Sequence, residues 1–248
     1  MIDKYNENTF NKNNYEFFHK ETTSSTMDDV KNFIKNKKKN CIYLSDKQIN
    51  GKGQRGNFWH SPLGNVYCSI SFENFLHIKD HFLFSVLVAL TVKKSLEIFN
   101  AKNIFFKWPN DIFFKKKKFG GIISELIKVN SKSYVIVGFG INIESSPKLS
   151  NYKTTFAKHF SDIKSKEDFL LVFFKQLFFK LSELQEGRKK YLMNEFSKSL
   201  LLFNEKILII NKNKEKNEGV FRGINDDGSL RLEKNGDIKN IYNGSIQI

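Results

Sequence analysis

Cysteine is nearly absent from this chain of 248 residues, which contains only Cys41 and Cys68. Two cysteines cannot form the disulfide framework that small secreted domains use in place of a large core. Neither cysteine has neighbours at metal-ligand spacing. Hydrophobic residues make up 40% of the chain, so a sizeable core can form without such covalent links. We therefore expect both thiols to be reduced and buried in an intracellular protein.

Long apolar runs are also missing. The longest stretches, such as residues 82–90, are far shorter than the roughly 20 residues that a membrane-spanning helix needs. Residues 1–8 are polar and lack the apolar segment of a signal peptide. These features lead us to expect a cytoplasmic protein with no membrane partner.

Arginine is rare although the chain is strongly basic. The 41 Lys and Arg residues against 26 Asp and Glu residues give a net charge of +15. The only arginines are Arg55, Arg188, Arg222 and Arg231. Proteins that read base edges rely on the two-pronged arginine side chain. Since Lys, Asn, Phe and Ile are frequent everywhere, loops included, we expect no specific DNA partner. A basic nucleic-acid-binding protein is the less favoured alternative.

Hydrophobic periodicity predicts both helices and strands before residue 204. Apolar residues at helical spacing predict a long core helix at residues 82–99. Other helices are predicted at residues 27–36, 166–184 and 188–200. Strands are predicted from residue 17 and at residues 41–44, 65–72, 104–107, 112–114, 122–129 and 133–143. Residues 1–14 are polar, and we expect them to be frayed.

The composition changes near residue 204. Short β-type runs follow at near-regular spacing, separated by Asp-Gly and Asn-Gly pairs that are typical of hairpin turns. This pattern predicts a small β-barrel of about five strands. We therefore expect two domains, residues 1–203 and residues 204–248.

A glycine-rich basic loop, Gly51 to Trp59, is the first candidate functional segment. Its glycines let backbone N–H groups approach an anion closely, and its basic residues suit a phosphate. No strand–loop–helix unit follows, so the segment is not a dinucleotide-binding Gly-x-Gly-x-x-Gly motif, and no Walker lysine–serine pair is present. Trp59 is either a core anchor or a plate that packs on the closed loop or a ligand. A mobile surface hairpin is the alternative interpretation of the loop.

The segment Lys107-Trp108-Pro109-Asn110-Asp111 is more specific. Pro109 excludes a helix and favours an extended Trp108, so Asn110 and Asp111 should lie at a strand end facing a cleft. Asp111 is either a turn residue or a base that accepts a proton from an incoming amine.

Two glycine pairs follow. Lys118 precedes Gly120 and Gly121, where a lysine can reach a phosphate and the glycines can let a flat ligand lie against the backbone. The strand at residues 137–143 contains a second pair and then Asn142. The Asn142 amide can pair with an adenine edge or can be a satisfied core group.

In this order, the segments resemble the signature of the biotin protein ligases. The resemblance covers nearly the whole chain and implies an α+β fold: a mixed or antiparallel sheet flanked by helices, as in class II synthetase-like biotin ligase catalytic domains, and a small C-terminal SH3-like β-barrel. The positions that carry it are Ser25-Thr26, Gln48, residues 51–59, residues 107–111, Lys118, residues 121–125, residues 138–142 and glycines of the tail.

The resemblance also implies an activity. Biotin and ATP with Mg²⁺ would form biotinyl-5′-AMP and pyrophosphate, and a lysine of a biotin carboxyl carrier domain would then displace AMP. We expect a monomer or a homodimer, and the sequence identifies no metal ligands. Because only a short polar segment precedes the catalytic region, we expect no N-terminal DNA-binding domain and no repressor role.

Individual roles follow from the same resemblance. Catalytic roles are assigned to Lys118, Asp111 and Arg55, with Asp111 as the base for the acceptor lysine. The implied biotin-binding residues are Ser25, Thr26, Gln48, Gly51, Lys52, Lys118, Gly120, Gly121 and Ile123. The implied nucleotide-binding residues are Lys52, Gln54, Arg55, Trp59, Asn110 and Asn142.

Several positions depart from the family pattern. Met27 replaces an asparagine, and Lys52 and Gln54 stand where many members have arginines, so we expect a less tightly held adenylate. Residues 115–118 are all lysines, and we favour Lys118 because it abuts the glycine strand. A lipoate- or octanoate-type acyl transferase is the nearest rival, but its expected Arg-Arg-x-x-Gly-Gly-Gly segment is absent.

Overall fold

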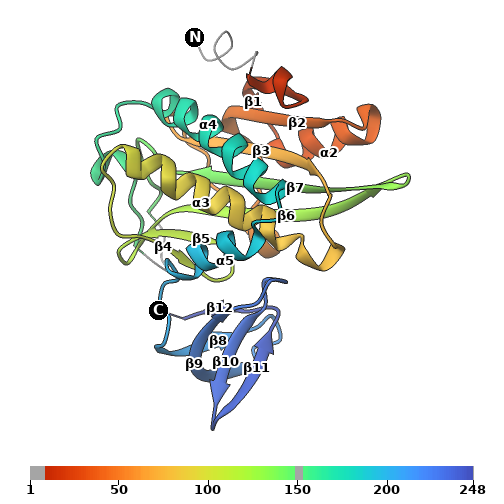
Figure 1. Ribbon diagram of the computed structural model, residues 1–248. Coiled ribbons are helices and arrows are strands. Elements are labelled where there is room, and N and C mark those ends of the chain that lie inside the picture. The colour runs from red at the N-terminus through yellow and green to blue at the C-terminus, as the bar shows by residue number, and fades with distance from the viewer. Residues whose placement is uncertain (1–8, 149–152, 248) are drawn as a thin grey trace.

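The computed structural model describes residues 9–148 and 153–247, which form two sheets. The larger sheet has seven strands in the order β1-β2-β3-β7-β6-β5-β4 (Figure 1). β1 and β2 are parallel, and the other neighbours are antiparallel. Its strands are β1 (Tyr15–Thr23), β2 (Asn40–Gln48), β3 (Val66–Glu73), β4 (Ile104–Lys107), β5 (Asp111–Phe114), β6 (Lys117–Val129) and β7 (Lys132–Ile141).

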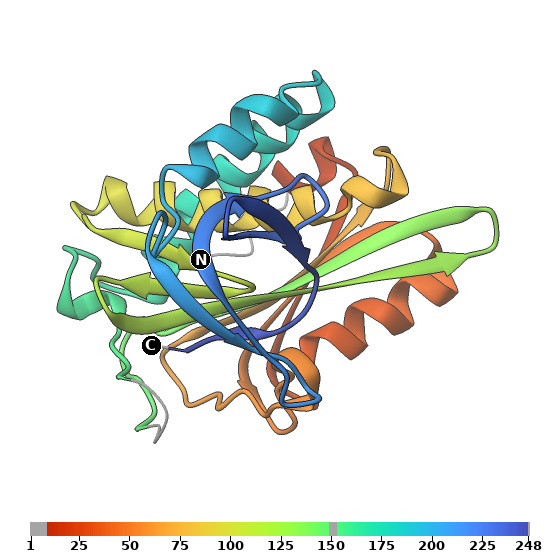
Figure 2. The same ribbon diagram turned by 90° about the horizontal axis from the view of Figure 1, so that it is seen from below.

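Helices cover both faces of this sheet. Figure 2 shows α3, α4 and α5 on one side and α2 on the other. Their bounds are α2 (Thr26–Lys37), α3 (Phe82–Ile98), α4 (Lys166–Gln185) and α5 (Lys189–Ser197), with short 3-10 helices at η1 (Gln54–Gly56), η2 (Ile78–Asp80) and η3 (Ala157–His159). α4 begins with a capping box, because Ser165 Oγ accepts from Asp168 N–H and the Asp168 carboxylate accepts from Ser165 N–H, both at 3.1 Å.

Strand alternation divides the core into two layers. In β2, Ile42 and Leu44 pack on the side of α3 and α4, whereas Cys41 and Tyr43 pack against α2. In β7, Tyr134 and Ile136 face α2, but the next two positions on that face are glycines. The α2 side of the sheet is therefore hollow toward the end of β7, and this hollow positions the site described below.

The C-terminal sheet is antiparallel, in the order β11-β10-β9-β8-β12. Its core continues into that of the large domain. Trp108 Nε1 donates a 2.9 Å hydrogen bond to the Gly228 carbonyl, which joins the β4–β5 turn to the β9–β10 turn. The strands are β8 (Lys206–Ile210), β9 (Lys216–Ile224), β10 (Leu230–Lys234), β11 (Asp237–Ile241) and β12 (Ser245–Ile246).

The predicted fold class is confirmed: a mixed α+β sheet flanked by helices, followed by a small β domain. The division of domains at residue 204 stays a prediction. In the described part of the chain, no helix combines the length and apolar character needed to cross a bilayer.

The expectation of a frayed segment at residues 1–14 is wrong where it can be checked. Residues 9–12 are helical, and residues 1–8 lie outside the described part. Phe10 is only 1% exposed, and its ring packs against those of Phe17 and Phe174 with centroids 4.6 and 5.0 Å away. The polar composition of the segment conceals this single aromatic anchor, whose burial is enough to order a turn of helix.

Candidate functional site

A cavity of about 690 Å³ occupies the hollow on the α2 side of the large sheet. Its floor is made of Gly121 of β6, Gly138 and Gly140 of β7, and Ser69 of β3. Gly121 and Gly140 are paired across the two strands. Without Cβ atoms at these positions, other groups can lie directly against the sheet backbone.

Trp59 is the flat group that covers two of these glycines. A Cβ at Gly140 would lie under 3.0 Å from three atoms of the Trp59 indole, and a Cβ at Gly121 would lie 3.0 Å from the same ring. We had interpreted the glycines as contacts for a flat ligand. In this structure the indole takes that place, and the Lys118 Nζ atom is 5.3 Å from its centroid.

Met27 closes another part of the floor. A Cβ at Gly138 would lie 2.6 Å from Met27 Sδ. Met27 is the second residue of α2 and is buried with the apolar residues between α2 and the sheet. The Met27 side chain therefore limits the cavity beside Gly138.

The polar wall beside α2 is built from the predicted residues Ser25, Thr26 and Gln48. Gln48 Oε1 accepts from Thr26 N–H at 2.9 Å and from Thr26 Oγ1 at 3.1 Å. Gln48 Nε2 donates to Ser61 Oγ at 3.2 Å. Gln48 thus orients the turn into α2, while Ser25 holds the N-cap position without making a side-chain cap bond.

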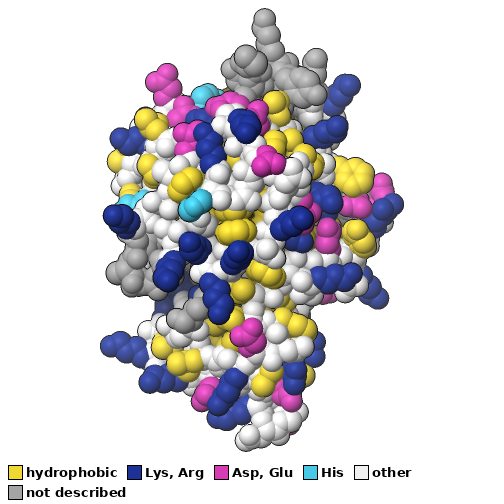
Figure 3. Space-filling view, turned by 90° about the vertical axis from the view of Figure 1, so that its left-hand side faces the viewer, with side chains coloured by type: hydrophobic (Ala, Val, Ile, Leu, Met, Phe, Trp, Pro, Cys, Tyr) yellow, Lys and Arg dark blue, Asp and Glu magenta, His cyan; other side chains and the backbone are white. Residues whose placement is uncertain are grey.

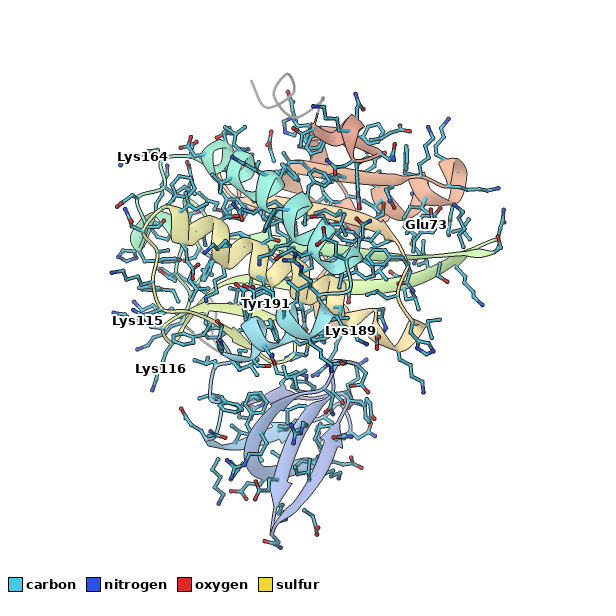
Figure 4. All side chains as sticks on the ribbon, viewed as in Figure 1. Glu73, Lys115, Lys116, Lys164, Lys189 and Tyr191 are labelled. Atoms are coloured by element: carbon cyan, nitrogen blue, oxygen red, sulfur yellow. The ribbon has the colours of Figure 1, made fainter. Side chains whose placement is uncertain are left out.

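Lys118 and Asp111 form an ion pair at 2.6 Å, and both side chains are largely buried. Lys115, Lys116 and Lys117 are exposed, and the first two lie at the left edge of the molecule in Figure 4. Lys118 is thus the buried lysine of the run, and its catalytic role stays a prediction. Asp111 is engaged by Lys118, so the carboxylate can accept a proton only after that lysine turns to another anion.

Asn142 lies just after β7 and lines the same cavity. Its backbone N–H donates to the Phe119 carbonyl at 2.7 Å, and its Nδ2 donates to the Thr155 carbonyl at 3.2 Å. These bonds hold the amide plane and leave Oδ1 as an unpaired acceptor.

Three buried side-chain atoms in the described residues have no hydrogen-bond partner: Ser25 Oγ, Trp59 Nε1 and Asn142 Oδ1. All three residues line this one cavity. Buried polar groups in folded proteins are nearly always paired. Unpaired groups that converge on a single cavity therefore indicate a ligand that supplies their partners.

The loop that ends at Trp59 is held at two points. Lys52 forms an ion pair with Asp28 in the first turn of α2. The Arg55 guanidinium donates to the Gly244 carbonyl and, at 3.0 Å, to Ser245 Oγ of β12. The arginine to which we assigned a catalytic role therefore joins the loop to the C-terminal domain while it lines the cavity.

We expect Arg55→Gln to speed chymotrypsin cleavage after Phe58 or Trp59 about tenfold, because a charge-assisted hydrogen bond stabilises by roughly 1.5 kcal/mol or more. The matched control is Lys47→Gln, whose lysine is exposed on β2. Equal cleavage of the two variants, followed by mass spectrometry, would show that the contact with β12 does not hold the loop.

Two predicted site residues do not reach the cavity. Gly120 faces the opposite side of the sheet, where a Cβ would lie 2.7 Å from Ile141 Cδ1. Gly51 lies behind Gln48, where a Cβ would be 3.1 Å from Nε2. Neither residue lines the cavity, and for Gly120 the reason is that alternate residues of a strand face opposite sides. The assignment of both to biotin binding stays a prediction. The predicted residues that do line the cavity are Ser25, Thr26, Gln48, Lys52, Gln54, Arg55, Trp59, Asn110, Asp111, Lys118, Gly121, Ile123 and Asn142.

The cavity is strongly basic. Among the described residues that line it, Asp111 is the one carboxylate. The cationic lining residues are Lys52, Arg55, Lys107, Lys116, Lys118 and Lys153. Figure 3 shows several Lys and Arg side chains gathered on one face of the large domain, above the C-terminal domain. Lys107, Lys116 and Lys153 were not among the predicted site residues, although Lys107 belongs to the motif at residues 107–111.

Two family models match this chain. Residues 19–142 match the biotin/lipoate A/B protein ligase family, and residues 202–248 match the biotin protein ligase C-terminal domain. The chain belongs to the biotin/lipoate A/B protein ligase family. The family predicted from the sequence motifs is thus confirmed.

Curated relatives agree with this membership. The chain is 28% identical over 224 residues to the bifunctional ligase/repressor BirA of Bacillus subtilis, and the match covers 84% of this chain and 66% of that protein. It is also 28% identical over 212 residues to BirA of Escherichia coli, covering 83% and 65%. The matched region therefore spans a little less than two thirds of these relatives.

Solved structures share the fold. The biotin protein ligase of Aquifex aeolicus in complex with biotin and ATP superimposes with a TM-score of 0.74 at 22% identity, covering 94% of this chain and 97% of that one. The Leishmania major biotin protein ligase in complex with biotinyl-5-AMP gives a TM-score of 0.63 at 21% identity, covering 92% and 98%.

Proposed function

We propose that this protein activates biotin with ATP to biotinyl-5′-AMP and transfers the biotinyl group to a lysine of a biotin carboxyl carrier domain. The convergence of Ser25 Oγ, Trp59 Nε1 and Asn142 Oδ1 on one basic cavity carries the proposal. A ureido ring needs partners at one end and an adenine needs an acceptor at the other, and the cations between them suit a phosphate.

The residues of the cavity divide into two groups. Ser25 binds the ureido group directly, Gln48 holds Thr26 in place, and Gly121 with Ile123 borders the biotin tail. At the other end, the Asn142 acceptor faces the adenine amino group. Trp59, Gln54 and Asn110 enclose the nucleotide.

Lys118 and Asp111 act in succession. In the first step a biotin carboxylate oxygen attacks the α-phosphorus of ATP, and Lys118 stabilises the negative charge that develops there. When Lys118 turns to the adenylate, Asp111 is released from the ion pair. Asp111 then accepts a proton from the acceptor lysine, which is a weak nucleophile while protonated.

The proposed reaction also implies a metal ion. Mg²⁺ would accompany ATP, because this ion is usually held by substrate phosphates, water and one or two carboxylates. Asp111 is the carboxylate that this cavity offers. We propose that the protein works in the cytoplasm as a monomer or homodimer.

The test is ATP–pyrophosphate exchange with the purified protein. We expect exchange that requires biotin and is not supported by lipoate or octanoate. Exchange with lipoate or octanoate would favour the acyl transferase alternative, for which the match of residues 202–248 to the biotin protein ligase C-terminal domain gives no support. No exchange with any of the three acids would contradict the proposal.

A further inference from the structure

Three lysines are buried in the described part of the chain: Lys107 is 9% exposed, Lys118 8% and Lys180 5%. Lys118 is paired with Asp111 at 2.6 Å, and Lys180 is paired with Glu195 at 3.0 Å. Lys107 has no hydrogen bond or ion pair of its own among residues 9–148 and 153–247. Its ammonium lies 5.7 Å from the centroid of the Phe113 ring. Because burying an unpaired charge is unfavourable, Lys107 is the exception that requires an explanation.

Lys107 stands where two cavities meet. It ends β4 opposite Asp111, the first residue of β5. It lines the cavity described above and also a second cavity of about 500 Å³, which reaches the C-terminal domain at residues 227–229. Both cavities are also lined by residues 52–55 of the loop. An occupant beside Lys107 would therefore lie next to the Lys118–Asp111 pair.

Around Lys107, the positive charges of nearby side chains exceed the negative charges. Burial lowers the pKa of the Lys107 ammonium, the Asp111 carboxylate opposes that effect, and the Lys118 charge adds to it. One carboxylate thus serves two lysines. The other carboxylates that line the second cavity are already engaged, since Glu125 is paired with Lys31 and Asp227 accepts from Ser229.

The start of α3 adds to this environment. Its first residue, Phe82, lines the second cavity together with His81 and Ser85. The first turn contains no acidic residue, and the helix has no side-chain N-cap bond. The positive end of the helix dipole is therefore not neutralised from within the helix, which favours an anion nearby.

We propose that Lys107 binds the β- and γ-phosphoryl groups of ATP, which leave as pyrophosphate. This inference rests on the proposed adenylation. In that step the bond between the biotin carboxylate oxygen and the α-phosphorus forms, the bond from the α-phosphorus to the bridging oxygen breaks, and its electron pair leaves with pyrophosphate. Lys118 serves the α-phosphoryl group, and Lys107 neutralises the leaving group beside it.

The experiment compares Lys107→Met with Lys107→Arg and with Lys180→Met. Two half-reactions are measured: biotin-dependent ATP–pyrophosphate exchange, and transfer from synthetic biotinyl-5′-AMP to a biotin carboxyl carrier domain. We expect Lys107→Met to raise the half-saturating pyrophosphate concentration at least thirtyfold and to leave transfer within threefold of wild type. Lys107→Arg keeps the charge and should stay within about fivefold in both.

Thermal unfolding separates binding from a structural role. Lys107→Met removes an unpaired buried charge and should keep or raise the Tm, whereas Lys180→Met breaks an ion pair and should lower it. An unchanged pyrophosphate dependence in Lys107→Met would overturn the inference, and so would an equal loss in both half-reactions or a loss confined to transfer. If wild type itself shows no exchange, the proposed function fails instead.

Discussion

Lys118→Ala should lower biotin-dependent pyrophosphate exchange about 1000-fold, which corresponds to about 4 kcal/mol of lost stabilisation of the transition state. The Lys118 ammonium is held 2.6 Å from Asp111 in the wall of the cavity, and both side chains are largely buried. A charge fixed in such surroundings stabilises developing negative charge far better than a solvated lysine does. The measurement is the exchange rate at saturating biotin and ATP.

The neighbouring lysine provides the matched control. Lys117 precedes Lys118 in β6 but is exposed, so Lys117→Ala should keep exchange within twofold of wild type. Similar losses in both variants would mean that the general basic charge matters and the buried position does not. Loss of less than tenfold in Lys118→Ala would contradict its proposed role.

Stability measurements separate catalysis from the ion pair. Lys118→Ala leaves the Asp111 carboxylate buried without its cation and should cost about 2 kcal/mol in the free energy of unfolding. Adding Asp111→Asn removes the unpaired charge and should recover most of that loss. The double variant should still be inactive in exchange, because it lacks the cation that we propose stabilises the α-phosphoryl group.

Gly140→Ala should destabilise the protein by about 2–3 kcal/mol and should also weaken biotin binding at least tenfold. The new Cβ would meet three indole atoms of Trp59 at under 3.0 Å. β7 is paired with β3 on one side and with β6 on the other, so its backbone cannot move away. The indole and the loop that carries it must move instead. Urea unfolding and biotin titration measure the two effects.

Gly121→Ala should produce a milder version of the same clash and serves as the comparison for Gly140→Ala. Its Cβ would meet the same indole at 3.0 and 3.5 Å, so a smaller shift suffices and we expect a cost of about 1 kcal/mol or less. A double-mutant cycle with Trp59→Ala isolates the contact. Gly140→Ala should be much less destabilising in that background, and additive effects would show that the indole does not rest on Gly140 in solution.

Much of the candidate site was predictable from the order of its motifs. Thirteen predicted positions, Lys118 and Asn142 among them, line one cavity although they lie far apart in the chain. Pro109 restricts the backbone, whereas the glycines permit close approaches that a Cβ would prevent, and both kinds of residue are visible in a sequence. The same is true of the helices and strands, whose hydrophobic periods reach across many residues.

Other features were not predictable because they depend on which face a residue takes or on contacts far along the chain. Gly120 and Gly121 are adjacent, yet the pleat directs them to opposite sides of the sheet, and only one lines the cavity. Arg55 contacts Ser245 of β12, which lies 190 residues further along the chain. The short helix that contains Phe10 was not predicted, because one apolar residue in a polar segment does not form a hydrophobic period.

The sequence by itself determined the family, the fold class and the residue types that meet at the site. Local backbone preferences and hydrophobic periodicity depend on residues that are close together in the sequence. Both can therefore be recognised without the tertiary structure. Only the tertiary structure decided that Trp59 covers Gly121 and Gly140, that Asp111 is paired with Lys118, and that Lys107 is buried with no carboxylate of its own among the described residues. Burial and pairing are set by neighbours from other strands, because the electrostatic free energy of a charged group depends on everything that surrounds it.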